Sequence, residues 1–261
     1  MWGRTLFQNV RKFIQFQMTM NISLITVIFL ASLSVGRPPF AVIHLLWMNL
    51  IMDTFAAVAL CTEPPYEEKY EDENAKKDDD DEGKSEDQTD KESRMRISRK
   101  DPIFNKNMWR NILPQAIYQI VVMCILMFCG QLIFFEESFN IITEPDTPVG
   151  NEITGRMKLN TMCFHTFMLM NMINLINCRD VSDDHLRIFK TFFNNKLFLL
   201  TLVVEIGVQV SMIYFGSKPD NSLHLILGTN PLTWAMHITA WVLALLTIPL
   251  HVLVVKFVPN E

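Results

Sequence analysis

Six stretches of this chain are apolar over about the length of a membrane-crossing helix. About 20 apolar residues of helix span the hydrocarbon core of a bilayer. Of the 261 residues 49% are hydrophobic, and the 20% that are charged gather between the apolar stretches. We therefore expect an all-α integral membrane protein, a six-helix transmembrane bundle with spans at 13–35, 40–61, 113–135, 160–177, 196–215 and 233–256.

The positions of Lys and Arg predict which side of the membrane each loop faces. Cytosolic loops of membrane proteins carry an excess of these two residues. With the N-terminus in the cytosol, only four of the 23 basic residues lie outside, and these are Arg37, Arg156, Lys158 and Lys218. Without the long central loop, eight basic residues remain inside against those four. We expect a multi-pass protein with both termini cytosolic.

The second apolar stretch contains a single acid, Asp53, far from either end. A carboxylate near the bilayer centre costs roughly 3 kcal/mol even on insertion scales, so it must face protein, a water path or a cation. Asn49 precedes it by four residues, so on an α-helix the two side chains share one face. Carboxylate and amide oxygens suit Ca²⁺ or Mg²⁺. The alternative is an acid that simply packs against a neighbouring helix.

A polar series in the first span faces this acid in the expected hairpin. The turn at 37–39 makes the first two spans antiparallel. Counted from the cytosolic ends of the two helices, Asn21 and Asp53 lie at similar depth, about 14–15 Å in. Asn21 is therefore a candidate ligand. Alternatively Asn21, Gln17 and Thr19 only form hydrogen bonds between helices, as polar residues in membranes often do.

These segments carry a family resemblance. LLWMNLIMDTFAAVALCTEPP, residues 45–65, resembles the sixth membrane helix of P-type calcium pumps, and NLIMD followed by ALCTEPP is similar to their plasma-membrane, calmodulin-regulated branch. KFIQFQMTMN, residues 12–21, resembles the fifth helix of the same family. The resemblance implies that the chain contains membrane helices five to ten and that Asp53, Asn49 and Asn21 are calcium ligands.

Three positions differ from the pumps of the sarcoplasmic-reticulum type, which bind two calcium ions. Where those pumps have an acid, a Thr and a Glu, this chain has Leu24, Met52 and Asn171. The resemblance therefore implies a single calcium site. Asn171 belongs, with Asn174 and Asn177, to a polar fourth span that resembles the eighth membrane helix. From the residues alone, we expect these amides to tie that helix to its neighbours.

On this interpretation the chain has five parts. Residues 1–12 are the cytosolic end of a stalk, 13–61 the hairpin with the ion site, 62–112 a cytosolic linker, 113–256 four further membrane helices, and 257–261 a short cytosolic tail. The linker begins with an acidic run that has too few apolar residues to bury and should be disordered. It ends in a basic amphipathic segment, which we expect at the membrane interface, with a calmodulin target as the alternative.

The resemblance implies the calcium-translocating membrane segment of an ATP-driven pump that exports Ca²⁺ from the cytosol, in the plasma membrane or an internal calcium store. The chain contains no DKTG phosphorylation motif and no TGE motif, so we assign it no catalytic residue. ATP and Mg²⁺ would act only through cytosolic domains in the N-terminal part of the pump. That part and the lipid bilayer are the expected partners, and no nucleic acid is expected. The alternative is a stand-alone, pump-derived membrane protein with a binding or regulatory role and no ATPase activity.

Two further groups of residues have no assigned role. Glu205 lies in the fifth span, four residues before Gln209. It could pair with a basic group on another helix, serve as a proton group or remain buried and neutral. In the last span, His237 and His251 are fourteen residues apart, which is too far for one metal site on a single helix.

Overall fold

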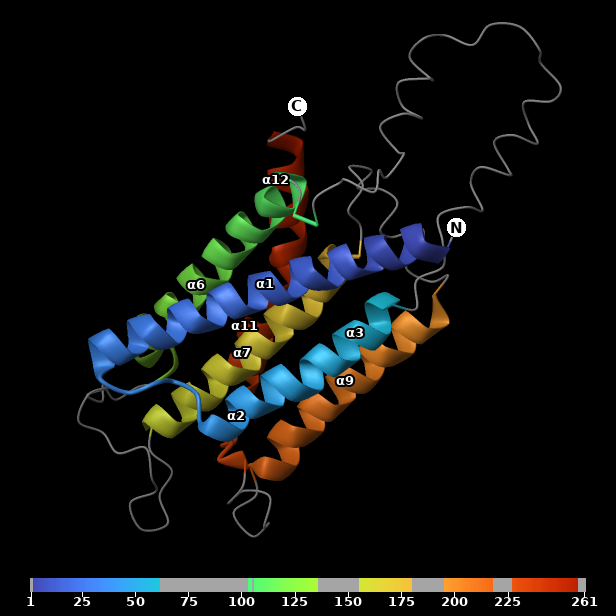
Figure 1. The fold of residues 1–261 in the computed structure, drawn as a ribbon. Coiled ribbons are helices and arrows are strands. Elements are labelled where there is room, and N and C mark those ends of the chain that lie inside the picture. Colours follow the sequence, from blue (N-terminus) through green and yellow to red (C-terminus); the bar gives the residue numbers. More distant parts are fainter. Residues whose placement is uncertain are drawn as a thin grey trace, which may run out of the picture.

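The structure, a computed structural model, describes residues 2–61, 103–104, 106–135, 155–179, 195–217 and 227–257. Within these ranges all regular secondary structure is helical, which confirms the all-α fold (Figure 1). The elements are α1 (Trp2–Val35), α2 (Val42–Trp47), η1 (Met48–Met52), α3 (Asp53–Cys61), α6 (Lys106–Phe134), α7 (Gly155–Asn177), α9 (Lys196–Gly216), α11 (Trp234–Leu245) and α12 (Thr247–Phe257). Elements α2, η1 and α3 follow one another without a gap, and η1 is a π-helix.

Five helical stretches are long and apolar enough to cross a membrane. They are Leu6–Val35, Val42–Cys61, Met108–Phe134, Lys196–Gly216 and Trp234–Phe257. Each contains or closely matches a predicted span, so five of the six predictions are confirmed. The remaining one, 160–177, lies within α7, which is helical but not apolar enough to be counted with the others.

Helix α7 differs from the others because it lies at the centre of the bundle. It packs against α1, α6, α9, α11 and α12, and Figure 1 shows it in yellow between them. Its residues are buried except for Gly155, Lys158, Asn160 and Ile176. A helix enclosed by protein does not need an apolar surface all round, because its polar side chains can bond to neighbouring helices instead of facing lipid.

Helix α1 runs unbroken through 34 residues, about 50 Å. The sequence contains no Pro or Gly between Thr5 and Val35, which is consistent with one continuous helix. It ends at Gly36, whose φ of 76° lies in the left-handed region and whose N–H donates to the carbonyl of Ser32 at 3.1 Å. Glycine adopts this conformation without a steric penalty, so it is a common helix terminator. Since a hydrocarbon core is about 30 Å thick, α1 extends well beyond it.

The helices alternate in direction through the bundle. The start of α1, the end of α3 and the start of α6 lie at one end, and the start of α7 lies at the other (Figure 1). Most of the predicted linker, residues 62–102, lies outside the described residues, which includes its acidic run and the first part of its basic segment. The end of the tail, 258–261, also lies outside them. Helix α6 already begins at Lys106, so the end of the predicted interfacial segment is continuous with the third membrane helix.

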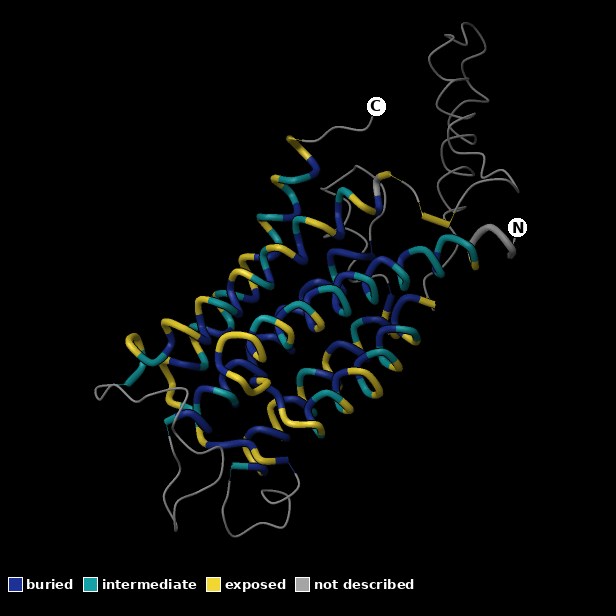
Figure 2. The backbone as a smooth tube through the Cα atoms, turned by 60° about the vertical axis from the view of Figure 1, so that its left-hand side comes forward, coloured by how far each residue is buried: buried dark blue, intermediate teal, exposed yellow. Residues whose placement is uncertain are grey.

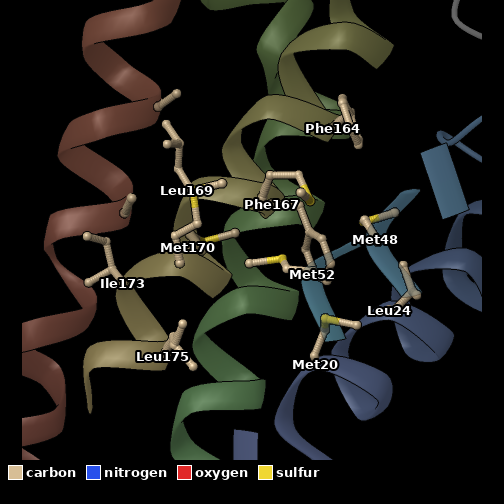
Figure 3. Close-up of a cluster of buried hydrophobic side chains, with 14 of the residues drawn as sticks. Met20, Leu24, Met48, Met52, Phe164, Phe167, Leu169, Met170, Ile173 and Leu175 are labelled. Atoms are coloured by element: carbon tan, nitrogen blue, oxygen red, sulfur yellow. The ribbon is translucent and has the colours of Figure 1, made fainter. Parts of the chain in front are cut away.

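The outward faces of the bundle are apolar. Figure 2 shows the exposed residues along the outer sides of the helices, and on α1 they include Ile25, Phe29 and Leu33, each at least 60% exposed. Such faces suit a lipid environment. The interior contains many methionines and aromatic side chains. Between α1, η1 and α7 these include Met20, Met48, Met52 and Phe167, and Leu24 packs among them (Figure 3).

Candidate metal centre

Asp53 stands where the π-helix η1 changes to α3. Its carboxylate Oδ2 accepts a hydrogen bond of 2.8 Å from Nε2 of Gln17 on α1. Its other oxygen, Oδ1, is buried and has no hydrogen-bond partner in the described part of the chain. A buried oxygen that lacks a partner is costly, and more so when it carries charge. Asp53 thus has one oxygen held by a neighbouring helix and one available to a ligand.

The π-helix was not predicted from the sequence. Helices of this type close their hydrogen bonds over five residues instead of four. They are rare, occur mostly as single turns inside α-helices, and are frequent at functional sites. Here the five residues Met48–Met52 end directly before the acid. A local change in hydrogen bonding also alters the direction of the backbone carbonyls, the other source of oxygen ligands in a membrane helix. No pattern in the amino-acid sequence distinguishes this turn from α-helix.

The three predicted ligands have different surroundings. Asp53 and Asn21 are partly buried, whereas Asn49 is exposed on the surface of the bundle. Neither amide forms a side-chain hydrogen bond within the described residues. The hydrogen bond from Gln17 places Gln17 directly beside Asp53. Asn21 is one helical turn further along α1, about 6 Å. The role of Asn21 as a ligand therefore stays a prediction.

The alternative role proposed for the polar series in α1 is confirmed for Gln17, which bonds to another helix. Thr19 does not: its hydroxyl donates within α1 to the carbonyl of Gln15 at 2.9 Å. An amide one turn from a candidate ligand was the only signal in the sequence for Gln17. It could not show which of Gln17 and Asn21 meets the acid, because that depends on how the two helices pack.

Two of the three positions at which this chain differs from the two-site pumps are filled with apolar side chains. Leu24 is 4% exposed and Met52 is fully buried. Figure 3 shows Met52 close to Phe167 of α7 and Leu24 near Met48. This region is part of the hydrophobic core. Neither side chain offers an oxygen to a hard cation such as Ca²⁺.

Two of the three asparagines in the polar series of α7 tie it to its neighbours, as predicted. The Oδ1 atom of Asn171 accepts from Nε2 of Gln119 on α6 at 3.2 Å. Asn177 donates through Nδ2 to the carbonyl of Thr247 on α12 at 3.2 Å. The prediction is therefore confirmed for these two residues. Asn174 accepts only a long contact of 3.8 Å from the thiol of Cys178, within the same segment.

Glu205 and Gln209 lie on the buried face of α9. Glu205 is 3% exposed and Gln209 is 1% exposed. The polar atoms of both side chains have no hydrogen-bond partner in the part of the chain that the structure describes. A basic partner for Glu205, one of the roles considered above, is thus not found among the described residues.

The chain is similar in sequence to known proteins. The family model described as "Cation transporting ATPase, C-terminus" matches residues 37–80 and 85–258. The chain is 33% identical to "Putative calcium-transporting ATPase 13, plasma membrane-type" of Arabidopsis thaliana over 92% of its length and 20% of that protein. It is 32% identical to "Calcium-transporting ATPase 8, plasma membrane-type" of Arabidopsis thaliana over 99% of its length and 20% of that protein. It is 29% identical to "Plasma membrane calcium-transporting ATPase 3" of Homo sapiens over 95% of its length and 18% of that protein. The chain thus spans about a fifth of the length of the curated relatives it matches.

Proposed function

Because this chain belongs to the cation-transporting ATPase family, as a C-terminal membrane region of the plasma-membrane calcium-pump type, we propose that it forms part of the path by which such a pump moves Ca²⁺ across a membrane. Asp53 is the charged ligand of the transported ion, and Asn49 and Asn21 supply amide oxygens. The observation that carries this proposal is the carboxylate of Asp53, which lies inside a membrane helix with its Oδ1 buried and unpaired.

The coordination of Ca²⁺ requires more oxygens than Asp53, Asn49 and Asn21 provide. Calcium takes six to eight oxygens, and one carboxylate with two amides provides at most four. Backbone carbonyls near η1 and water can supply some of the others. The remaining ligands come from the N-terminal part of the pump, which would pack on the face where Asn49 is exposed. An amide is costly against lipid, so a protein partner on this face is favoured.

We propose one calcium ion per transport cycle. The buried Leu24 and Met52 support this, since they fill with carbon and sulfur the region where a second set of oxygens would be needed. Nucleotide binding and phosphorylation belong to cytosolic domains of the same pump, which use ATP and Mg²⁺. The hydrogen bond between Gln17 and Asp53 joins α1 to the ion site. Movement of the long helix α1 would therefore alter the coordination of the ion.

Calcium uptake by a chimaeric pump tests the proposal. This chain would replace the matching fifth of the Arabidopsis thaliana pump to which it is 32% identical over 99% of its length. Vesicles with the chimaera should accumulate Ca²⁺, and Asp53→Asn, which keeps the shape but removes the charge, should reduce uptake to background. The control is Thr239→Val, an equally small change at a residue whose hydroxyl only bonds to its own helix. Uptake by Asp53→Asn with unchanged calcium dependence would contradict the assignment.

A further inference from the structure

Two histidines from different helices meet inside the bundle. Nε2 of His165 on α7 and Nδ1 of His237 on α11 lie 3.3 Å apart. The ring centroids are 5.1 Å apart, with an interplanar angle of 80°. The two residues are 72 positions apart in the sequence, so only the packing of α7 against α11 brings them together.

The separation of the two nitrogens fits a shared metal ion. Zinc–nitrogen bonds are about 2.0–2.1 Å long, and two such bonds at a tetrahedral angle place their nitrogens about 3.3–3.4 Å apart. Hydrogen bonds from N–H to oxygen usually have donor–acceptor distances of about 2.7–3.2 Å. The observed 3.3 Å is thus at the long end for a hydrogen bond and in the expected range for two ligands of one ion.

The surrounding structure holds the pair in place. His165 is 1% exposed, and α11, on which Met236 and Ala240 are buried, packs against α7. One turn before His165, the hydroxyl of Thr161 accepts a hydrogen bond of 3.1 Å from the backbone N–H of Asn230. This bond fixes the segment that leads into α11. A pair of ligands held on two packed helices binds metal better than a flexible pair, because little entropy is lost on binding.

The position of His237 allows a cation to reach the two histidines from the aqueous phase. It lies in the first turn of α11, three residues after Trp234, and is partly exposed. Trp234 itself is 84% exposed, as is usual for tryptophans at a membrane–water interface. A cation from the aqueous phase at this end of the bundle can therefore reach the pair without crossing the apolar interior.

We propose that His165 and His237 form a binding site for a divalent transition metal ion, with Zn²⁺ as the reference ion, that links α7 to α11. Imidazole nitrogens suit zinc, copper and nickel, whereas Ca²⁺ and Mg²⁺ prefer oxygen. The site is therefore separate from the transported ion and from Asp53. Two positions of a tetrahedral ion remain for water, as in zinc sites that keep open positions.

Features of the structure also limit the affinity of this site for a metal ion. Metal binding at Nε2 of His165 places the ring proton on Nδ1, which is buried and has no partner in the described residues. An unpaired buried donor is unfavourable. The start of α11 adds the partial positive charge of a helix N-terminus. No group of three or more His, Cys, Asp or Glu side chains suited to a metal occurs within the described ranges. We therefore expect micromolar affinity, much weaker than that of four-ligand structural zinc sites.

The test is zinc binding by the whole chain, purified in detergent without a histidine tag. Equilibrium titration should show one Zn²⁺ bound at micromolar concentration. His165→Asn and His237→Asn should each lower that affinity at least about tenfold, since even outer-shell changes have effects of this size. The matched control is His251→Asn, the same change at a buried histidine on α12, and it should bind as the wild type does. Equal zinc binding by the double variant would overturn the proposal.

A second measurement on the unaltered chain removes any dependence on how the variants fold. Electron paramagnetic resonance of the chain with one equivalent of Cu²⁺ should show coupling to two imidazole nitrogens. A spectrum with one nitrogen or none, or no binding at micromolar copper, would overturn the proposal. Neither measurement involves calcium uptake. A negative result would therefore contradict the zinc site without contradicting the calcium site, and a negative result in calcium uptake would not contradict the zinc site.

Discussion

The hydrogen bond between Gln17 and Asp53 provides a quantitative test of how the ion site is held together. Gln17→Met keeps the length of the side chain but removes the N–H that donates to Oδ2 at 2.8 Å. Hydrogen bonds between membrane helices contribute about 0.6 kcal/mol on average and at most about 1.7. Bonds to a charged acceptor are roughly twice as strong as neutral ones. We expect a coupling free energy between Gln17 and Asp53 of about 1–2 kcal/mol, a factor of about 5–30 in the unfolding equilibrium.

A double-mutant cycle measures this coupling. The free energy of unfolding of the whole chain in bicelles, without calcium, is compared for the wild type, Gln17→Met, Asp53→Leu and the double variant. The control cycle pairs Gln17→Met with Thr54→Val, since the hydroxyl of Thr54 bonds only within its own helix. The control coupling should be near zero. If the Gln17–Asp53 coupling is no larger than the control coupling, the bond does not hold α1 to the ion site and the reasoning is wrong.

Three further predictions follow from the other features. Equilibrium calcium binding to the assembled pump should give a stoichiometry near one, because Leu24 and Met52 fill the second position; a value near two would refute this. Asn177→Leu removes the bond to the carbonyl of Thr247 and should lower the free energy of unfolding by about 0.5–1.5 kcal/mol, measured by the same unfolding assay; an unchanged value would show that the amide does not tie α7 to α12. Deletion of residues 71–92, an acidic stretch with no apolar face in the sequence, should leave maximal calcium uptake by the chimaeric pump near wild type, and loss of most uptake would contradict it.

The helices themselves were predictable because their signals are local. The uninterrupted sequence of α1 and the Gly after it determine one long helix that ends at Val35. Apolar stretches of bilayer length give five of the spans directly. Helix α7 was predicted as a span, but its central position was not, because its neighbours are determined by packing rather than by its own residues.

The candidate site was predictable in part. The position of Asp53 within an apolar stretch identified the acid, since few residues are so costly in lipid. The sequence did not decide whether Gln17 bonds to Asp53, because this depends on the register between two helices. Counting residues from the helix ends does not give that register to within one turn. The π-helix and the pair of His165 and His237 were not predicted. Both arise from local backbone or tertiary contacts that leave no periodic pattern in the sequence.

The central position of α7 has a consequence for how the protein is made. A polar helix such as this, with three asparagines and with Arg156 and Lys158 near its start, is a poor substrate for independent insertion into lipid. Of the helices around it, α1 and α6 are synthesised before α7, and α9, α11 and α12 after it. At the moment when α7 leaves the ribosome, half of its surroundings do not yet exist. Its integration must therefore be completed after translation of the last helices, so late truncations of the chain should leave α7 outside the bilayer.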